Sequence, residues 1–126
     1  METKFTAGPW KYSWRQVDGE ADCGVFAEPH EGQAYSVCRA PRYQTEEQWD
    51  ADARLIAAAP ELLEACQTFA EWLRREDAGF IKAGGERDTP EGEAKWREWY
   101  HENLRICDLA QTQAIAAIAK ATGSQP

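Results

Sequence analysis

The chain has 126 residues, a length that suits one domain with a hydrophobic core of its own. Its net charge of −8 argues against binding to nucleic acid, because affinity for a phosphate backbone rests mainly on Lys and Arg. No apolar run approaches the ~20 residues that span a membrane. Met1–Lys4 is not followed by the apolar core of a signal peptide. We therefore expect a cytosolic protein that binds neither membrane nor nucleic acid directly.

Residues 1–44 predict a small antiparallel β-meander. Trp10–Val17 alternates aromatic and polar residues with period two, which is typical of a half-buried strand. Turn signals follow at Asp18–Gly19 and at Pro29–Gly32. They delimit a second, weaker strand through Cys23, Val25 and Phe26 and a third strand at Ala34–Arg39. One face of such a meander must be covered by a helix.

Residues 45–79 predict two helices broken at Ala59–Pro60, and we interpret the rest of the chain as packed against them. Thr45 and Gln48 have capping-box spacing at the start of the first helix. Pro60 cannot donate a backbone hydrogen bond, but it is well tolerated at the first position of a new helix. Gly79 is the expected stop. Apolar residues of the second helix share one face: Leu62, Leu63, Cys66, Phe69, Ala70 and Leu73.

Residues 80–88 contain Gly84–Gly85, lack periodicity and predict a mobile loop. Thr89 and Pro90 then begin a long helix over 89–122 with a hydroxyl cap and a proline at the first position. Its apolar series is Trp96, Trp99, Tyr100, Leu104, Cys107, Ala110, Ala114 and Ile118. Residues 123–126 are a tail. The fold class is therefore α+β, a single domain in which an N-terminal β-meander packs on a helical hairpin with a long C-terminal helix.

Catalytic signatures are missing from the sequence. It lacks the Gly-x-Ser-x-Gly elbow, the phosphate loop and the HExxH pattern. His101 and Cys107 stand six residues apart and are poorly aligned on one helix, while Asp50 and Asp52 point to different helical faces. Cys23, His30 and Cys38 match no common zinc spacing, and Cys66 and Cys107 sit on apolar stripes as small core residues do. We therefore expect that the protein is not an enzyme and that it binds neither a cofactor nor a metal ion.

An aromatic face is one candidate for ligand binding. Trp10, Tyr12 and Trp14 lie on one side of the first predicted strand, in the neighbourhood of Arg39 and Arg42. Interleaved aromatic and basic residues are what stacking on nucleotide bases requires. The alternative is that these rings are core between sheet and helices, because apolar alternation normally marks the buried face. The core interpretation is favoured, and nucleotide binding is kept as a rival.

An acidic surface is the second candidate. Residues 1–44 carry 5 basic and 6 acidic side chains and residues 45–126 carry 9 and 16, so the helical part holds −7 of the −8. Such charge usually serves solubility. The sharper hypothesis is that the acidic helical surface, represented by Glu93, Glu98 and Glu102, contacts a basic protein partner.

The stretch Ala51–Ala65 carries a family resemblance. It is similar to a motif that recurs in small uncharacterised proteins of tailed bacteriophages and prophages, where it typically reads Asn-Ala-Arg-Leu-Ile-Ala-Ala-Ala-Pro-Glu-Leu-Leu. Asp52 stands where Asn is usual. Thr6–Trp10 similarly resembles a Thr-Pro-Gly-Pro-Trp start, with Ala7 in place of the first proline. Residues 80–126 fall outside the resemblance.

The resemblance implies a class of roles. Small acidic phage accessory proteins often bind and block a host protein, or sequester a nucleotide signal. We therefore expect a non-catalytic accessory protein that binds a host protein in the cytoplasm of the bacterial host, as an inhibitor of an antiviral defence system. The alternatives are a nucleotide sponge that uses the aromatic face and a structural homo-oligomer, such as a homodimer formed through the long last helix.

Overall fold

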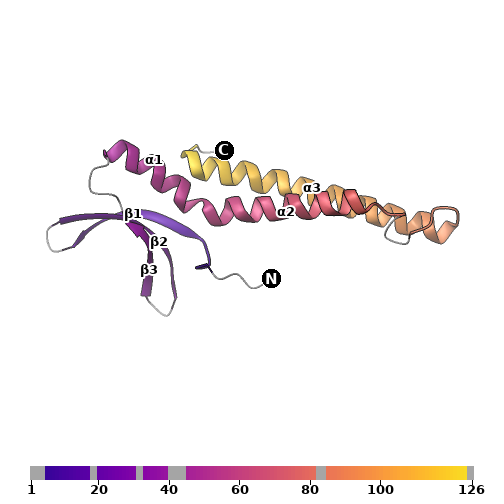
Figure 1. The fold of residues 1–126 in the computed structure, drawn as a ribbon, viewed down its shortest axis with the longest axis horizontal. Helices are drawn as coiled ribbons and strands as arrows, with labels where there is room; N and C mark the ends of the chain where they lie inside the picture. The colour runs from indigo at the N-terminus through magenta and orange to yellow at the C-terminus, as the bar shows by residue number, and fades with distance from the viewer. Residues whose placement is uncertain (1–4, 18–19, 31–32, 40–44, 82–84, 125–126) are drawn as a thin grey trace. The chain divides into compact units, whose positions relative to one another are not determined.

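The protein is described here from a computed structural model that covers residues 5–17, 20–30, 33–39, 45–81 and 85–124. Side chains are described for these residues except 12–17, 20–23, 28–30, 33–36, 39 and 46. Three strands precede three helices, in the order β1–β2–β3–α1–α2–α3 (Figure 1). The fold is α+β, as predicted. The chain divides into two compact units, Met1–Leu63 with Ile115–Pro126 and Glu64–Ala114, and each is described by itself.

The first unit contains an antiparallel sheet of order β1-β2-β3. Strand β1 spans Trp10–Val17, as predicted, and β3 spans Gln33–Arg39. Strand β2 spans Glu20–His30 and therefore continues through Pro29, so the turn predicted to begin at Pro29 begins too early. The ladder between β2 and β3 is irregular between Ala27 and His30. A proline, which has no N–H to donate, is tolerated at such an interruption.

Helix α1 (Glu46–Ala57) covers this sheet through a small core. Val25 on β2 and Trp49, Ala53 and Ala57 on α1 are buried together, with Trp10, Val37, Cys38 and Ile56 packed against them. Gly24 allows β3 to come close, because a Cβ there would lie 2.7 Å from the carbonyl oxygen of Cys38. The predicted capping box is confirmed: Thr45 Oγ1 accepts from Gln48 N, and Gln48 Oε1 accepts from Thr45 N, both at 3.2 Å.

The predicted helix break is present, one residue earlier than expected. Helix α1 ends at Ala57, Ala58 caps it, and α2 runs from Ala59 to Ala78. Pro60 is thus the second residue of α2 rather than the first. Backbone N–H groups at the first positions of a helix have no partner within the helix, so a proline at either position removes no hydrogen bond.

The second unit consists of residues 64–78 of α2, the segment that follows, and the first part of α3 (Pro90–Thr122). Gly79 ends α2 with a φ of 67°, and its N–H donates to the carbonyl of Arg75 at 2.9 Å. Helix α3 begins as predicted, because Thr89 Oγ1 accepts from Gly92 N at 2.9 Å and Pro90 occupies the first position.

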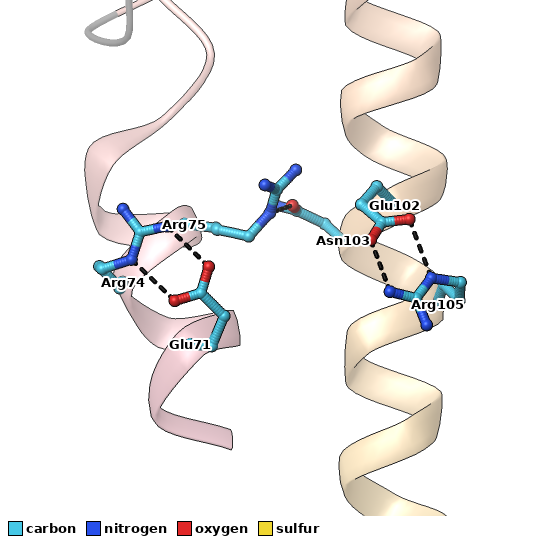
Figure 2. Close-up of polar contacts among 6 residues, drawn as sticks. All are labelled: Glu71, Arg74, Arg75, Glu102, Asn103 and Arg105. Atoms are coloured by element: carbon cyan, nitrogen blue, oxygen red, sulfur yellow. Dashed lines mark hydrogen bonds and ion pairs between the residues drawn. The ribbon is translucent and has the colours of Figure 1, made fainter. Parts of the chain in front are cut away.

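Within this unit α2 and α3 run antiparallel, and we call residues 64–114 the helical hairpin. Its register is fixed by three contacts spaced along it. The Phe80 and Trp99 rings lie 6.1 Å apart, Arg75 Nε donates to Asn103 Oδ1 at 2.6 Å, and Gln113 Nε2 donates to Glu64 Oε1 at 3.0 Å. From the first contact to the third, the earlier partner in the chain goes back from Phe80 to Glu64, while the α3 partner goes forward from Trp99 to Gln113. This is the pattern of an antiparallel pair. Figure 2 shows the middle contact, in which Arg75 reaches across to Asn103.

The seam between the two helices follows a 3–4 residue spacing. On α2 it consists of Ala65, Thr68, Trp72 and Arg75, all buried or half-buried, and on α3 of Trp96, Trp99, Asn103, Ile106, Ala110 and Gln113. Asn103 is 1% exposed and is the buried polar residue of this seam. Its Nδ2 also donates a hydrogen bond to Glu76 Oε1 at 3.0 Å.

The apolar faces expected to carry the packing are therefore placed differently from the seam. Phe69 is 51% exposed, Leu73 41%, Tyr100 43% and Leu104 46%. Of the predicted α3 series, Trp96, Trp99 and Ala110 do belong to the seam. The hydrophobic pattern indicated the neighbouring face of α2 because the seam there includes the polar residues Thr68 and Arg75 and the small residue Ala65, which such a pattern passes over.

Candidate functional site

The hairpin has two unlike sides, which follow from its seam. In a right-handed helix each step along the chain turns by about 100°. Residues that directly follow a seam residue therefore lie to one side of it, and residues that directly precede one lie to the other. Since α2 and α3 are antiparallel, the residues that follow the seam lie on the same side of the pair in both helices. The residues that precede it lie together on the opposite side.

The preceding residues form an acidic side. On α2 they include Glu64 before Ala65 and Glu71 before Trp72, and on α3 they include Glu98 before Trp99 and Glu102 before Asn103. Glu98 is exposed, and Glu102 is half-buried at the helix surface. We call Glu64, Glu71, Glu98 and Glu102 the acidic side. It is assembled from two segments that are far apart in sequence.

Three cations partly neutralise this side: Lys95, which directly precedes Trp96, and two arginines that pair with its glutamates. Arg74 donates to Glu71 at 2.8 and 2.6 Å, and Arg105 donates to Glu102 at 2.9 and 2.6 Å, each within its own helix (Figure 2). These hydrogen bonds hold the pKa values of Glu71 and Glu102 below their usual range and raise those of the two arginines. Both carboxylates therefore stay charged under mildly acidic conditions.

The three glutamates predicted as one surface are divided by the structure. Glu98 and Glu102 lie four residues apart on the acidic side. Glu93 precedes Glu98 by five residues, which turns it about 140° away, and its carboxylate pairs with Arg87 Nε at 2.9 Å. The structure thus joins Glu98 and Glu102 to Glu64 and Glu71 on α2, which the sequence hypothesis did not include. Helical spacing could have separated Glu93, whereas the α2 glutamates needed the register of the hairpin.

Of the aromatic candidate residues on β1, only Trp10 has a described side chain. Trp10 is half-buried, packs against the core of the first unit and donates its indole N–H to the carbonyl of Thr6 at 3.2 Å. The ladder pairs Tyr12 with Val25 and Trp14 with Cys23. The side chains of Tyr12, Trp14 and Arg39, and all of Arg42, lie outside the described residues. Nucleotide binding by this set stays a prediction.

A second aromatic group, which the sequence interpretation did not assign to ligand binding, lies at the loop end of the hairpin. The Trp96 and Tyr100 rings are stacked with centroids 5.2 Å apart, and the Arg87 guanidinium lies 3.8 Å from the Trp96 ring centroid. Phe80, which follows the end of α2, contacts Trp99. Trp96 and Trp99 thus each contact a residue of the segment that joins the helices, and Trp96 also contacts Tyr100 on its own helix.

Within the described part of the chain, no three His, Cys, Asp or Glu side chains gather as metal ligands would. Within the same part, none of the helices combines the length and the apolar character needed to cross a bilayer. Cys38, Cys66 and Cys107 are free thiols.

Comparison with protein families gives one match, which covers nearly the whole chain. The profile of the family described as Salmonella phage P22 protein Y8K6 matches residues 1–125. The chain belongs to this phage protein family. Its bacteriophage origin, which the resemblance of residues 51–65 implied, is confirmed, whereas the motif itself stays a resemblance. Neither the curated proteins nor the solved structures gave a match.

Proposed function

We propose that this Y8K6-family protein is a non-catalytic phage accessory protein that binds a host protein through the acidic side of its helical hairpin. One observation carries the proposal. Glu64 and Glu71 on α2 and Glu98 and Glu102 on α3 lie on one side of one structural unit, although the two pairs are far apart in sequence.

The chemistry of this side fits a basic protein surface. Carboxylates whose pKa values are lowered by neighbouring arginines stay ionised over the whole physiological range. Arg74 and Arg105 add donors in a fixed geometry beside them, which favours a partner with mixed charge over a bare cation. Complementary charge chiefly raises the association rate and the specificity of such a complex, and it makes binding sensitive to salt.

Phage origin supports the biological role that we propose. A small phage protein without catalytic groups acts most directly by occupying a host protein in the cytoplasm of the infected cell. Inhibition of an antiviral defence system is the role we favour. No cofactor and no direct contact with membrane or nucleic acid enter this proposal.

The test is affinity capture from a lysate of the bacterial host with the tagged chain and two variants. The double variant E98K/E102K reverses charge on the acidic side. E93K makes the same change on the same helix but off that side, and it costs only an exposed ion pair worth about 1 kcal/mol or less. One dominant host protein should be retained by the wild type and by E93K, and lost with E98K/E102K or at high salt. Equal retention by all three chains would refute the acidic-side contact.

A further inference from the structure

The side of the hairpin opposite the acidic side is apolar and exposed. It contains uncharged residues that directly follow the seam, together with Ala70 beside Phe69: Cys66, Phe69, Ala70 and Leu73 on α2, and Tyr100, Leu104, Cys107 and Gln111 on α3. We call these eight residues the apolar side. Toward the loop end the same row continues with two charged residues, Glu76 and Arg97. Phe69 and Leu104 alone leave about half of their side-chain surface in water, at 51% and 46% exposure.

The hairpin by itself buries little. Among the described residues of the second unit, the buried hydrophobic side chains are Ala65, Ile106 and Ala110, of which two are alanines. A fully buried large side chain stabilises a fold far more than a buried alanine does. An antiparallel helix pair normally gains its stability by packing its apolar stripe against further helices. The apolar side therefore needs a cover.

The area available matches a small but specific interface. Residues 64–78 of α2 give a helix of roughly 22 Å, and two adjacent helices give a width of about 20 Å. The apolar side thus offers on the order of 500 Å² on one partner, or about 1,000 Å² for two copies together, which is near the lower limit for a stable interface. Two such hairpins face to face make a four-helix bundle, in which each helix contributes a seam residue and its neighbour to the core.

The edges of the apolar side carry charges that favour a second copy. On α2, Glu76 directly follows Arg75 and Asp77 lies one step farther round the helix; on α3, Arg97 directly follows Trp96. All three are exposed and stand near the loop end of the hairpin. A twofold axis parallel to the helices places the α2 edge of one copy beside the α3 edge of the other, with the loop ends together. Asp77 of each copy then lies roughly 6–7 Å along the bundle axis from Arg97 of the other, a little more than one helical turn.

We propose that a second copy of this chain covers the apolar side, forming a parallel-axis twofold dimer whose core is a four-helix bundle. The acidic sides of the two hairpins then face outward. This inference is independent of the host-protein proposal, since it concerns the purified chain alone. It also places the exposed surfaces of Phe69 and Tyr100 and the cysteines Cys66 and Cys107 in an interface.

Sedimentation velocity of the purified full chain tests the proposal, with two leucine variants as a matched pair. Leu104 lies on the apolar side and is 46% exposed; Leu109 precedes Ala110 on the opposite side and is 41% exposed. Because both are surface leucines of the same helix in the single chain, L104E and L109E should fold equally well, as circular dichroism will verify. We expect a dimer for the wild type and L109E, and a dissociation constant raised roughly 100-fold or more in L104E, because a carboxylate would be buried at the interface.

Charge exchange at the edges tests the symmetry. D77R and R97D should each weaken the dimer several-fold through like-charge contacts, and the double variant D77R/R97D should restore it. A wild-type chain that stays monomeric at 100 µM-scale concentration, or equal dissociation in L104E and L109E, would overturn the proposal. Loss of host-protein capture in L104E together with a monomeric wild type would assign the apolar side to a different partner and would equally overturn it. Failure of the charge exchange alone to restore the dimer would overturn the parallel-axis arrangement.

Discussion

Replacement of Asn103 by alanine tests whether the polar seam stabilises the hairpin. Asn103 is 1% exposed and makes two side-chain hydrogen bonds, with Arg75 at 2.6 Å and with Glu76 at 3.0 Å. Hydrogen bonds to charged groups contribute about 1.5–3 kcal/mol each. Arg75 and Glu76 reach solvent and regain water in the variant, so the lower value applies and the loss is about 3 kcal/mol. Alanine returns up to about 0.7 kcal/mol through helix propensity, which leaves N103A destabilised by about 2 kcal/mol.

Chemical denaturation and thermal unfolding measure this change. For a chain of this length, 2 kcal/mol lowers Tm by roughly 6–10 °C. T112A is the control, since Thr112 lies on the same helix, is exposed and bonds only to the carbonyl of Asp108 among its described partners; we expect it to change the free energy of unfolding by about 0.5 kcal/mol or less. A cycle with R75A should give a coupling of about 1–2 kcal/mol. Strictly additive N103A and R75A effects, or an N103A effect no larger than that of T112A, would refute the reasoning.

Three further outcomes are expected. G92A should destabilise although alanine is the better helix former, because a Cβ at Gly92 would collide with the carbonyl of Glu86; urea unfolding measures it, and a stabilised variant would contradict the reasoning. T45A should cost about 1 kcal/mol through loss of the N-cap and T45S much less, compared by the same assay. R105Q should raise the pKa of Glu102 toward its ordinary value in an NMR carboxyl titration. Because the pKa of Glu102 is lower in the folded than in the unfolded chain, its pair with Arg105 stabilises the fold above the unfolded pKa. That contribution is lost as pH falls through the folded pKa.

Local signals predicted the element boundaries well, because each boundary depends on a few neighbouring residues. The Thr45 and Thr89 caps need only a hydroxyl two or three residues before a backbone N–H that would otherwise lack a partner. Gly79 needs only a residue without a Cβ at a positive φ. Period-two alternation located Trp10–Val17 to the residue. Pro29 misled the prediction because its tolerance depends on the register of a neighbouring strand.

The polar part of the seam could not be predicted from hydrophobicity. When each helix is considered alone, a polar side chain is expected at the surface, and this applies to Thr68, Arg75 and Asn103. They become interior only when two helices are brought together in one register, and that register depends on contacts such as Arg75 with Asn103 that join residues 28 apart. The same limitation applies to the acidic side: Glu98 and Glu102 follow from helical spacing, whereas their companions Glu64 and Glu71 follow from the pairing.

The mismatch between pattern and burial itself carries information about assembly. Sequences place large apolar residues at helical spacing where they will be buried, and Phe69, Leu73 and Leu104 have that spacing without that burial in the single chain. A polar residue buried between helices, such as Asn103, commonly fixes register at a cost in stability. A hairpin that fixes its register with a polar seam has its hydrophobic surface left for another contact. On this view the seam determines how α2 and α3 align, and the apolar side supplies the stability when a second hairpin covers it. L104E should therefore lower Tm to the extent that it converts dimer into monomer. N103A should lower the Tm of monomer and dimer alike.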